Sequence, residues 1–483
     1  MILCYATNQV SDNGASKHKC KIPRPIQFLG FILVVEATAL EYTNPQGRVT
    51  KFVGYRYAGG GGALDTNIIR NDRIGLDHPC FNKHSRAPSA YSNETSRKNT
   101  ITMQDPIHLT EEMRLIRAQV RRFIAEEIVP RGEAWEADGM VPREVLRHMG
   151  ELGFLGMRHP EDYGGSGLGA MASLILSEEL GRSTFGGFSA TVLVHTDMAS
   201  PHLARYGSSA QKERYLPAIC RGETITAVAV TEPGAGSDVA GLVCRAVADG
   251  DDYLLNGAKM FITNGVHGDL FFVATRTDPD VKGSRGISIF MVEKDTPGFA
   301  VSRQLDKHGW RCSDTAELVF TDCRVPRANL LGEENKGFYA IMDNFQNERL
   351  VLSGMAIGEA GKALEITLAY LKERQAFDGT LWDKQGIRQR LAMLAAQVEA
   401  ARQLAYHVAW LDSEGQDCVA EVSMLKAMSA EVVNRMLYDC VQFHGGMGYI
   451  RESTIERMSR DARLLPIGGG ATEVMLEEVA KRL

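Results

Sequence analysis

The order in which hydrophobic patterns change along the chain restricts its fold more than any other feature. After residue 103, apolar residues recur at helical spacing, beginning with Leu115, Ile116, Val120, Phe123, Ile124 and Ile128. From about residue 224 the chain consists of short segments rich in Val, Ile, Phe and Thr, which are typical of antiparallel strands. Beyond Gly332 long helical patterns return. Because the strands interrupt the helices and do not alternate with them, the pattern disfavours a Rossmann sheet.

These changes predict an α+β fold of three domains around one shared site. We expect an N-terminal α-helical domain over residues 103–223, an antiparallel β domain over 224–334 and a C-terminal helical bundle over 335–483. Residues 1–102 have no sustained period and contain the run Gly59–Gly62, so we predict a disordered extension or a mis-assigned start. The apolar run Phe28–Val35 is too short to span a membrane, and no secretory signal is recognisable.

The charge and the cysteines narrow the range of partners. Residues 1–102 contain 13 Lys/Arg against 7 Asp/Glu, and the remainder contains 41 against 53, a net charge of −12. An acidic body of this kind argues against nucleic acid as the main partner. The nine cysteines form no CxxC pair or zinc-site spacing, so we expect reduced thiols inside the cell and no metal.

Four segments carry a resemblance to a known family: TEPGAGSDVAG (231–241), KMFITNG (259–265), ERQAFDGTLWDKQ (373–385) and QFHGGMGYI (442–450). In this order and at these separations, from about Leu109 to the C-terminus, the chain resembles the acyl-CoA dehydrogenases. The resemblance implies a helical domain, a β-barrel and a four-helix bundle. It also implies FAD as cofactor, acyl-CoA as substrate in fatty-acid β-oxidation, an electron-transfer flavoprotein as acceptor, and a homotetramer or homodimer. The compartment would be bacterial cytoplasm or the mitochondrial matrix, without a membrane-spanning segment.

The first two segments predict one wall of a cofactor site. In GAGSD the third glycine of a dinucleotide fingerprint would fall at Val239, and no βαβ unit surrounds it. A turn of small residues with free N–H groups suits a flavin edge and a thioester, although a plain β-turn between strands explains it equally well. The resemblance implies that Ser237 contacts acyl-CoA. It implies flavin contacts for Val230, Thr231, Ile262, Phe261 and Thr263. At the position of Phe261 the family frequently has Trp.

The third and fourth segments predict a site for the other half of the cofactor. Arg374 offers a cation for pyrophosphate, Phe377 a ring for adenine stacking and Gln385 an amide for the adenine edge. A helix-end Arg beside a core Phe is the alternative. The resemblance assigns the adenosine half of FAD, partly across a subunit boundary, to these residues together with Gln442, Gly445 and Gly446. Two residues that begin the last helix, Thr472 and Glu473, also belong to the implied cofactor site.

The catalytic base is the least obvious residue. Many family members carry it at the position of Gly469, where glycine has no group that accepts a proton. Glu348 lies on one helical stripe with Ile341, Phe345 and Leu352, and a carboxylate on an apolar stripe is paired, protonated or functional. The alternative is an edge glutamate that reaches solvent or pairs with Arg349.

The resemblance decides for Glu348. Long-chain and isovaleryl-type members place their base at this position, with Arg349 on the substrate side. Gly469 and Gly470 then make room for the substrate, and the Gly469 N–H can bind the thioester carbonyl. Glu473 is a rival base. An oxidase that reduces O₂ and a catalytically silent acyl-CoA-binding protein remain alternatives, and the acyl chain is open between medium or long and branched.

Overall fold

The computed structural model describes residues 105–106, 109–281 and 283–483, together with the backbone of five strands in the first hundred residues. The chain divides into two compact units, Met1–Asn99 and Thr100–Leu483. In the first unit an antiparallel sheet has the order β1-β2-β3-β4-β5. Its strands are β1 (Ala6–Val10), β2 (Ser16–Cys20), β3 (Val35–Thr43), β4 (Val49–Tyr57) and β5 (Ile68–Ile69). The prediction of a disordered extension did not anticipate these strands, and the rest of that prediction lies outside the described residues.

The second unit begins with a helical region. Thr110 starts it as predicted: its hydroxyl accepts a hydrogen bond from the Met113 N–H at 3.2 Å, and two acidic residues occupy the favourable first turn. A turn of π-helix, η3 (Val194–Ala199), follows α5 directly. The α-helices are α1 (Glu111–Phe123), α2 (Gly132–Asp138), α3 (Arg143–Glu151), α4 (Gly169–Gly181), α5 (Gly186–Leu193), α6 (Ser200–Tyr206) and α7 (Ser209–Cys220).

A β domain follows, built from an eight-stranded sheet in the order β11-β12-β8-β7-β9-β10-β13, with β6 paired to β9. Most neighbours are antiparallel as predicted, but β6 and β7 both run parallel to β9. β9 and β10 are buried on both faces, which explains their continuous apolar sequences. The strands are β6 (Thr226–Ala229), β7 (Arg245–Asp249), β8 (Asp252–Thr263), β9 (Leu270–Arg276), β10 (Ile287–Glu293), β11 (Phe299–Gln304), β12 (Thr315–Pro326) and β13 (Leu330–Leu331).

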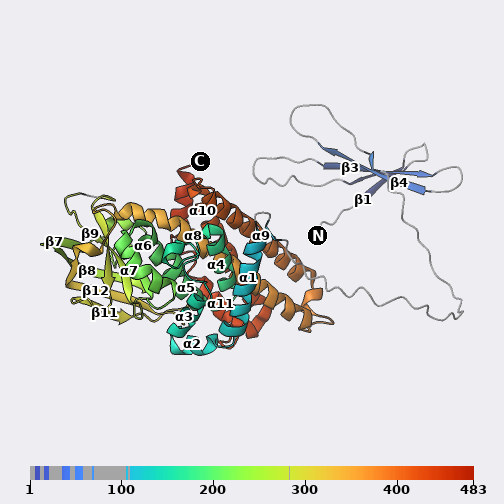
Figure 1. The fold of residues 1–483 in the computed structure, drawn as a ribbon. Helices are drawn as coiled ribbons and strands as arrows, with labels where there is room; N and C mark the ends of the chain where they lie inside the picture. Colours follow the sequence, from blue (N-terminus) through green and yellow to red (C-terminus); the bar gives the residue numbers. More distant parts are fainter. Residues whose placement is uncertain are drawn as a thin grey trace. The chain divides into compact units, whose positions relative to one another are not determined.

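The C-terminal region is helical again, so the predicted helical, β and helical order is confirmed (Figure 1). Its helices are α8 (Gly337–Glu373), α9 (Gln385–Ser413), α10 (Val419–His444), α11 (Thr454–Ala462) and α12 (Thr472–Ala480). α8, α9 and α10 pack against one another, and α12 packs on α10. No helix in the described ranges is both long and apolar enough to cross a bilayer.

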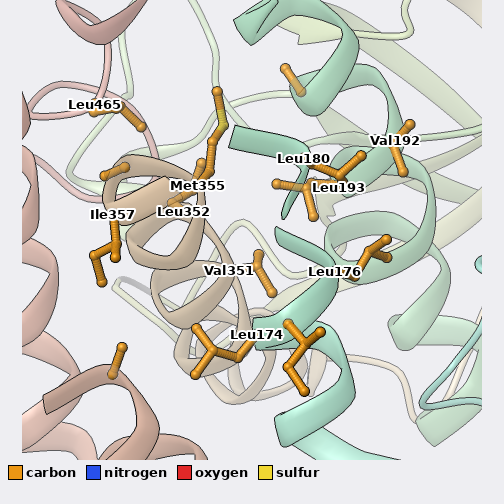
Figure 2. Close-up of a cluster of buried hydrophobic side chains, with 14 of the residues drawn as sticks. Leu174, Leu176, Leu180, Val192, Leu193, Val351, Leu352, Met355, Ile357 and Leu465 are labelled. Atoms are coloured by element: carbon orange, nitrogen blue, oxygen red, sulfur yellow. The ribbon is translucent and has the colours of Figure 1, made fainter. Parts of the chain in front are cut away.

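The 37-residue helix α8 joins the two helical regions, because its middle crosses α4 at very short range. A Cβ atom at Gly358 would lie 1.8 Å from the Glu178 carbonyl oxygen, and one at Gly181 would lie 2.1 Å from the Met355 carbonyl oxygen. Glycine therefore permits the contact. Leucine and valine side chains from α4, α5 and α8 fill the space around the crossing (Figure 2). The middle of α8 is thus packed tightly against α4.

Candidate active site

Glu348 lies in the buried part of α8. Only 7% of its surface is exposed, and Ile341 and Leu352 on the same stripe are buried with it. The alternative of an edge glutamate that reaches solvent is therefore wrong. Burial raises the pKa of Glu348 to about 8, although a hydrogen bond from Asn344 and the charge of Arg349 oppose the rise. The carboxyl group thus titrates near neutral pH instead of several units below it.

Asn344 fixes the Glu348 carboxyl group against the N-terminal helical region. Its side-chain amide donates to Glu348 Oε1 at 3.1 Å and to the Met198 carbonyl at 3.0 Å. The Asn347 amide donates to the Asp197 carbonyl at 2.8 Å, so the π-helical turn η3 is tied to α8 at two points. Such π-helical turns occur frequently at functional sites.

The loop that contains Gly468, Gly469 and Gly470, called the glycine loop below, contacts the same stripe one turn further along α8. Gly469 has a φ of +64°, and a Cβ atom added there would lie 2.1 Å from Leu352 Cδ1. Gly470 has a φ of +100°, and its added Cβ atom would lie 2.8 Å from Met475 Cε. Both positions therefore favour glycine for their positive φ, and a side chain at either would also require the Leu352 or the Met475 side chain to move. The structure brings the loop beside α8, four residues from Glu348 along the helix.

Arg349 lies beside this loop as well. An added Cβ atom on Gly470 would lie 3.9 Å from Arg349 Nε, and this nitrogen has no hydrogen-bond partner among the described residues. The Arg349 guanidinium lies over the Phe345 ring at 5.9 Å from its centroid. Burial lowers the pKa of Arg349, as expected for a cation removed from water. In the described ranges it makes no ion pair with Glu348 within 4.0 Å, so the alternative in which the two residues form a salt bridge is not supported.

Phe261 is displayed by a local irregularity in the β domain. In the pairing of β8 with β12, Ile262 faces Ala316 while Lys259 already faces Leu318, so β8 carries one extra residue. This bulge gives Phe261 a φ of 61°, which is strained for an aromatic residue, and leaves 64% of its surface exposed. A strained backbone that holds an apolar ring in the open indicates a binding wall. Ile262 is buried and Thr263 half-buried beside it.

The loop that follows β6 is fixed next to that wall. The Met260 N–H donates to the Thr231 carbonyl at 2.9 Å. Lys259 Nζ donates to the Val230 carbonyl at 3.0 Å and forms a fully buried ion pair with Glu232 at 2.8 Å. Buried charges of this kind are costly unless they are paired and hydrogen-bonded, and the Glu232 carboxylate also accepts two backbone N–H groups. The loop is therefore rigid, with Ser237 exposed at its far side.

The loop and α8 also meet in one apolar cluster. Ala235 and Val239 of the loop pack in the same core as Ile341, with Val230 and Phe345 against it. Helix α6 contributes Leu203 to this core. The predicted flavin loop, the helical stripe that contains Glu348 and the N-terminal helical region therefore meet in one apolar core.

The predicted adenosine-binding residues lie together near the ends of α8 and α10, away from Glu348 and the glycine loop. The Tyr370 ring stacks on the His444 ring with centroids 4.2 Å apart, which places the segment after α8 beside the end of α10. Arg374 and Gln385 are exposed, and 89% of Phe377 is exposed. The other three residues of this set, Gln442, Gly445 and Gly446, are exposed too. An added Cβ atom at either glycine would meet nothing within 4 Å, so the surface is open here.

Thr472 and Glu473 begin α12 as predicted and line a recess in the surface. The Thr472 hydroxyl lies 3.5 Å from Glu431 Oε1. The recess has a volume of about 490 Å³ and includes Arg463 among its lining residues. Glu473 is exposed at its edge, whereas Glu348 is buried. The structure does not bring Glu473 into the apolar stripe of α8.

Comparison with known proteins decides the family. Three domain families match consecutive parts of the chain: the N-terminal, middle and C-terminal domains of acyl-CoA dehydrogenase, over residues 110–223, 227–323 and 335–483. The chain belongs to the acyl-CoA dehydrogenase family. Enzymes of this family are FAD-dependent oxidoreductases that act on CH–CH donors, and this protein is one of them.

Individual relatives agree with this assignment. Mitochondrial isovaleryl-CoA dehydrogenase from Pongo abelii is 39% identical over 393 residues, which cover 80% of this chain and 93% of the relative. Mitochondrial long-chain specific acyl-CoA dehydrogenase from Sus scrofa is 39% identical over 377 residues, covering 77% and 87%. The crystal structure of acyl-CoA dehydrogenase from Geobacillus kaustophilus is similar with a TM-score of 0.76 and 41% identity, covering 78% of this chain and 99% of that one.

The residues of this acyl-CoA dehydrogenase fit its cofactor. A flavin is a planar, largely apolar ring system, and the exposed Phe261 ring in its strained bulge offers a matching wall. A dinucleotide also has a polyanionic middle and an adenine, for which Arg374 and the exposed Phe377 ring supply a cation and a stacking surface. The open turn at Gly445 and Gly446 leaves space for close backbone approach.

Three features of the site were missed from the sequence. Asn344 lies one helical turn before Glu348, a spacing that could have identified it as a partner. Lys426, which donates hydrogen bonds to carbonyl groups of the glycine loop, interrupts an apolar face of α10. A lysine on such a face could have been recognised in the sequence. The pairing of Glu232 with Lys259 carried no sequence signal, because the two residues meet only when β8 packs beside the loop.

Proposed function

We propose that this enzyme converts acyl-CoA thioesters to 2-enoyl-CoA thioesters, with Glu348 as the base that removes the α-proton. The observation that carries the proposal is a buried carboxyl group, pKa about 8, beside a glycine loop that has no carboxylate of its own. A general base works best when its pKa lies near the operating pH, and Glu348 satisfies this condition. Asn344 holds the accepting carboxyl group in place.

The balance of the reaction assigns a task to each residue. The α C–H bond breaks and its proton passes to the Glu348 carboxylate. Negative charge then develops on the thioester oxygen, where the exposed Gly469 N–H can donate a hydrogen bond. Bound FAD supplies the acceptor for the hydride that leaves the β-carbon. Ser237 and Arg349 contact the CoA thioester in this proposal, and Gly470 leaves space for it.

The cofactor residues form two groups in this proposal. Val230, Thr231, Ile262, Phe261 and Thr263 line the flavin ring. The second group holds the adenosine half: Arg374, Phe377, Gln385, Gln442, Gly445, Gly446, Thr472 and Glu473. The exposure of the Phe377 ring supports a second subunit over this surface, in a homotetramer or homodimer. Light scattering of the holoenzyme tests the assembly.

The substrate class is an acyl chain of medium to long length or with a branch. Relatives named for isovaleryl-CoA and for long-chain acyl-CoA are equally similar, which supports both. An electron-transfer flavoprotein is the proposed acceptor. A substrate series from short to long chains with branched members, assayed with this acceptor and for peroxide, distinguishes the dehydrogenase from an oxidase.

The decisive experiment replaces Glu348 with Gln. The variant should bind FAD and acyl-CoA, yet the visible flavin band should no longer bleach when acyl-CoA is added. Glu473→Gln is the matched comparison, since it removes the rival base in the same way. Bleaching that survives in Glu348→Gln and disappears in Glu473→Gln would reverse the assignment. A wild-type protein whose flavin responds to no acyl-CoA would support the silent alternative.

A further inference from the structure

Lys426 is a buried cation whose ammonium group, among the described residues, hydrogen-bonds only to backbone carbonyls of the segment 465–470. It lies in α10 with 1% of its surface exposed. Its Nζ donates to the carbonyl oxygens of Leu465 at 2.5 Å, Gly468 at 2.8 Å and Gly470 at 2.7 Å. Among the described residues no carboxylate lies within 4.0 Å of it. An unpaired buried ammonium group is costly, so the three carbonyl dipoles are what stabilises this charge.

One of these three bonds acts on the peptide that bears the proposed substrate donor. The Gly468 carbonyl and the Gly469 N–H belong to the same planar unit, and the described residues contain no cis peptide bond. In a trans peptide the N–H points away from the C=O. Fixing the oxygen on Lys426 Nζ therefore aims the Gly469 N–H to the opposite side. A positive charge on the oxygen also polarises the unit, which makes the N–H a stronger donor.

The loop has little else to hold its centre. In the described part of the chain the Gly469 N–H has no hydrogen-bond acceptor, while the neighbouring Gly468 N–H bonds to Leu464 at 2.9 Å. At the other end the Thr472 N–H bonds to the Pro466 carbonyl at 3.0 Å. Between these two bonds the glycines can adopt many conformations, and they carry no side chains that could pack. Lys426 supplies the missing constraint.

We propose that Lys426 is a positioning residue for the dehydrogenation, which fixes and polarises the peptide whose Gly469 N–H binds the thioester oxygen. The inference rests on the proposed function and adds a residue to it. Arg349, which lies beside Gly470, gives the same loop a second positive charge. The two cations are close enough for Arg349 to lower the pKa of Lys426, after burial as the main cause, to about 8. The loop is thus electrostatically prepared for the oxygen on which charge develops.

The test compares wild-type holoenzyme with Lys426→Met, which keeps the length of the side chain and removes its charge and donors. An acyl-CoA analogue that cannot be dehydrogenated, labelled with ¹³C at the thioester carbonyl, is bound to each, and the C=O stretching band reports the strength of the hydrogen bond on that oxygen. We expect the band to shift toward the frequency of a weakly bonded carbonyl. We also expect kcat to fall about 10- to 100-fold, less than the loss from deleting a whole donor, with a smaller change in KM.

Two further variants separate positioning from a general loss of stability. Lys426→Gln keeps a neutral donor and should give an intermediate band shift. Tyr406→Phe removes a buried hydrogen bond to Glu178 in a network that does not contact the loop. It should lower the melting temperature and leave the carbonyl band unchanged. If Lys426→Met does not fold, the carbonyl band of Lys426→Gln, compared with that of the wild type, tests the positioning role in the same way.

The outcomes distinguish the two levels of the argument. A wild-type enzyme that oxidises no acyl-CoA refutes the proposed function. If the wild type is active but the variants keep its carbonyl band, only the role of Lys426 is refuted, whatever the stability of the variants. The positioning role is supported if the carbonyl frequency and kcat change together in the series Met, Gln and Lys at position 426 while the FAD content stays constant.

Discussion

Replacing Glu348 with Gln should change the pH dependence of stability in a direction that most substitutions do not. The folded protein holds the pKa of this acid at about 8, whereas its ordinary value is 4.5. Its stabilising contribution is therefore complete below pH 4.5 and is lost as the pH rises through about 8. At 1.36 kcal/mol per unit, the shift corresponds to at most about 5 kcal/mol. Gln cannot ionise, so the variant should become more stable relative to wild type as the pH rises.

Guanidinium unfolding of both proteins between about pH 5 and pH 9 measures this difference, at fixed concentrations of protein and FAD. Asp197, Glu359 and Asp461 also have raised pKa values through burial, but both proteins share them and they cancel in the comparison. In the same range kcat/KM of the wild type should rise about tenfold per pH unit as the pH approaches about 8, where Glu348 ionises, and should fall at higher pH as Lys426 loses its charge. A stability difference that does not vary with pH, or a flat activity profile, would refute the assignment of a buried, ionisable base.

Three other changes probe the surroundings of the site. Gly469→Ala should cost about 2–4 kcal/mol, because φ is +64° and the new methyl group meets Leu352; a double-mutant cycle with Leu352→Ala should recover about half. Lys259→Met leaves the Glu232 carboxylate buried without its cation and should cost about 3–5 kcal/mol, seen as a lower unfolding midpoint with weakened FAD retention; wild-type values for both would contradict it. Gly358→Ala places a methyl group 1.8 Å from a backbone oxygen of α4, so thermal unfolding should occur at least several degrees lower.

Much of the fold was readable from periodicity, because helix packing and strand burial leave different spacings of apolar residues. The stripe of Ile341, Phe345, Glu348 and Leu352 predicted a buried acid, and the structure buries it. The domain limits proposed at 223/224 and 334/335 fall in the loops before β6 and before α8.

The contacts that shape the site could not be predicted, because they join residues far apart in sequence. The bulge that exposes Phe261 results from the register of β8 against β12, which no local pattern encodes. Asp461 accepts hydrogen bonds from the N–H groups of Gly186 and Trp310, 275 and 151 positions away. The three carbonyl groups bound by Lys426 also depend on how α10 lies against the loop. A candidate catalytic residue could be predicted when it lies on one helix with a clear apolar stripe. The contacts that position it could not be predicted, because they join several elements.

The contact of Gly469 with Leu352 has a consequence for how such enzymes diverge. A single mutation that restored an acid at position 469 would place its first side-chain carbon 2.1 Å from a leucine methyl group, on a backbone that favours glycine. Exchanging one proposed location of the acid for the other therefore requires that the Leu352 side chain move or become smaller, or that the turn be reshaped. Reconstructed sequences along that path should show a smaller residue at 352 or a changed loop sequence whenever an acid stands at 469.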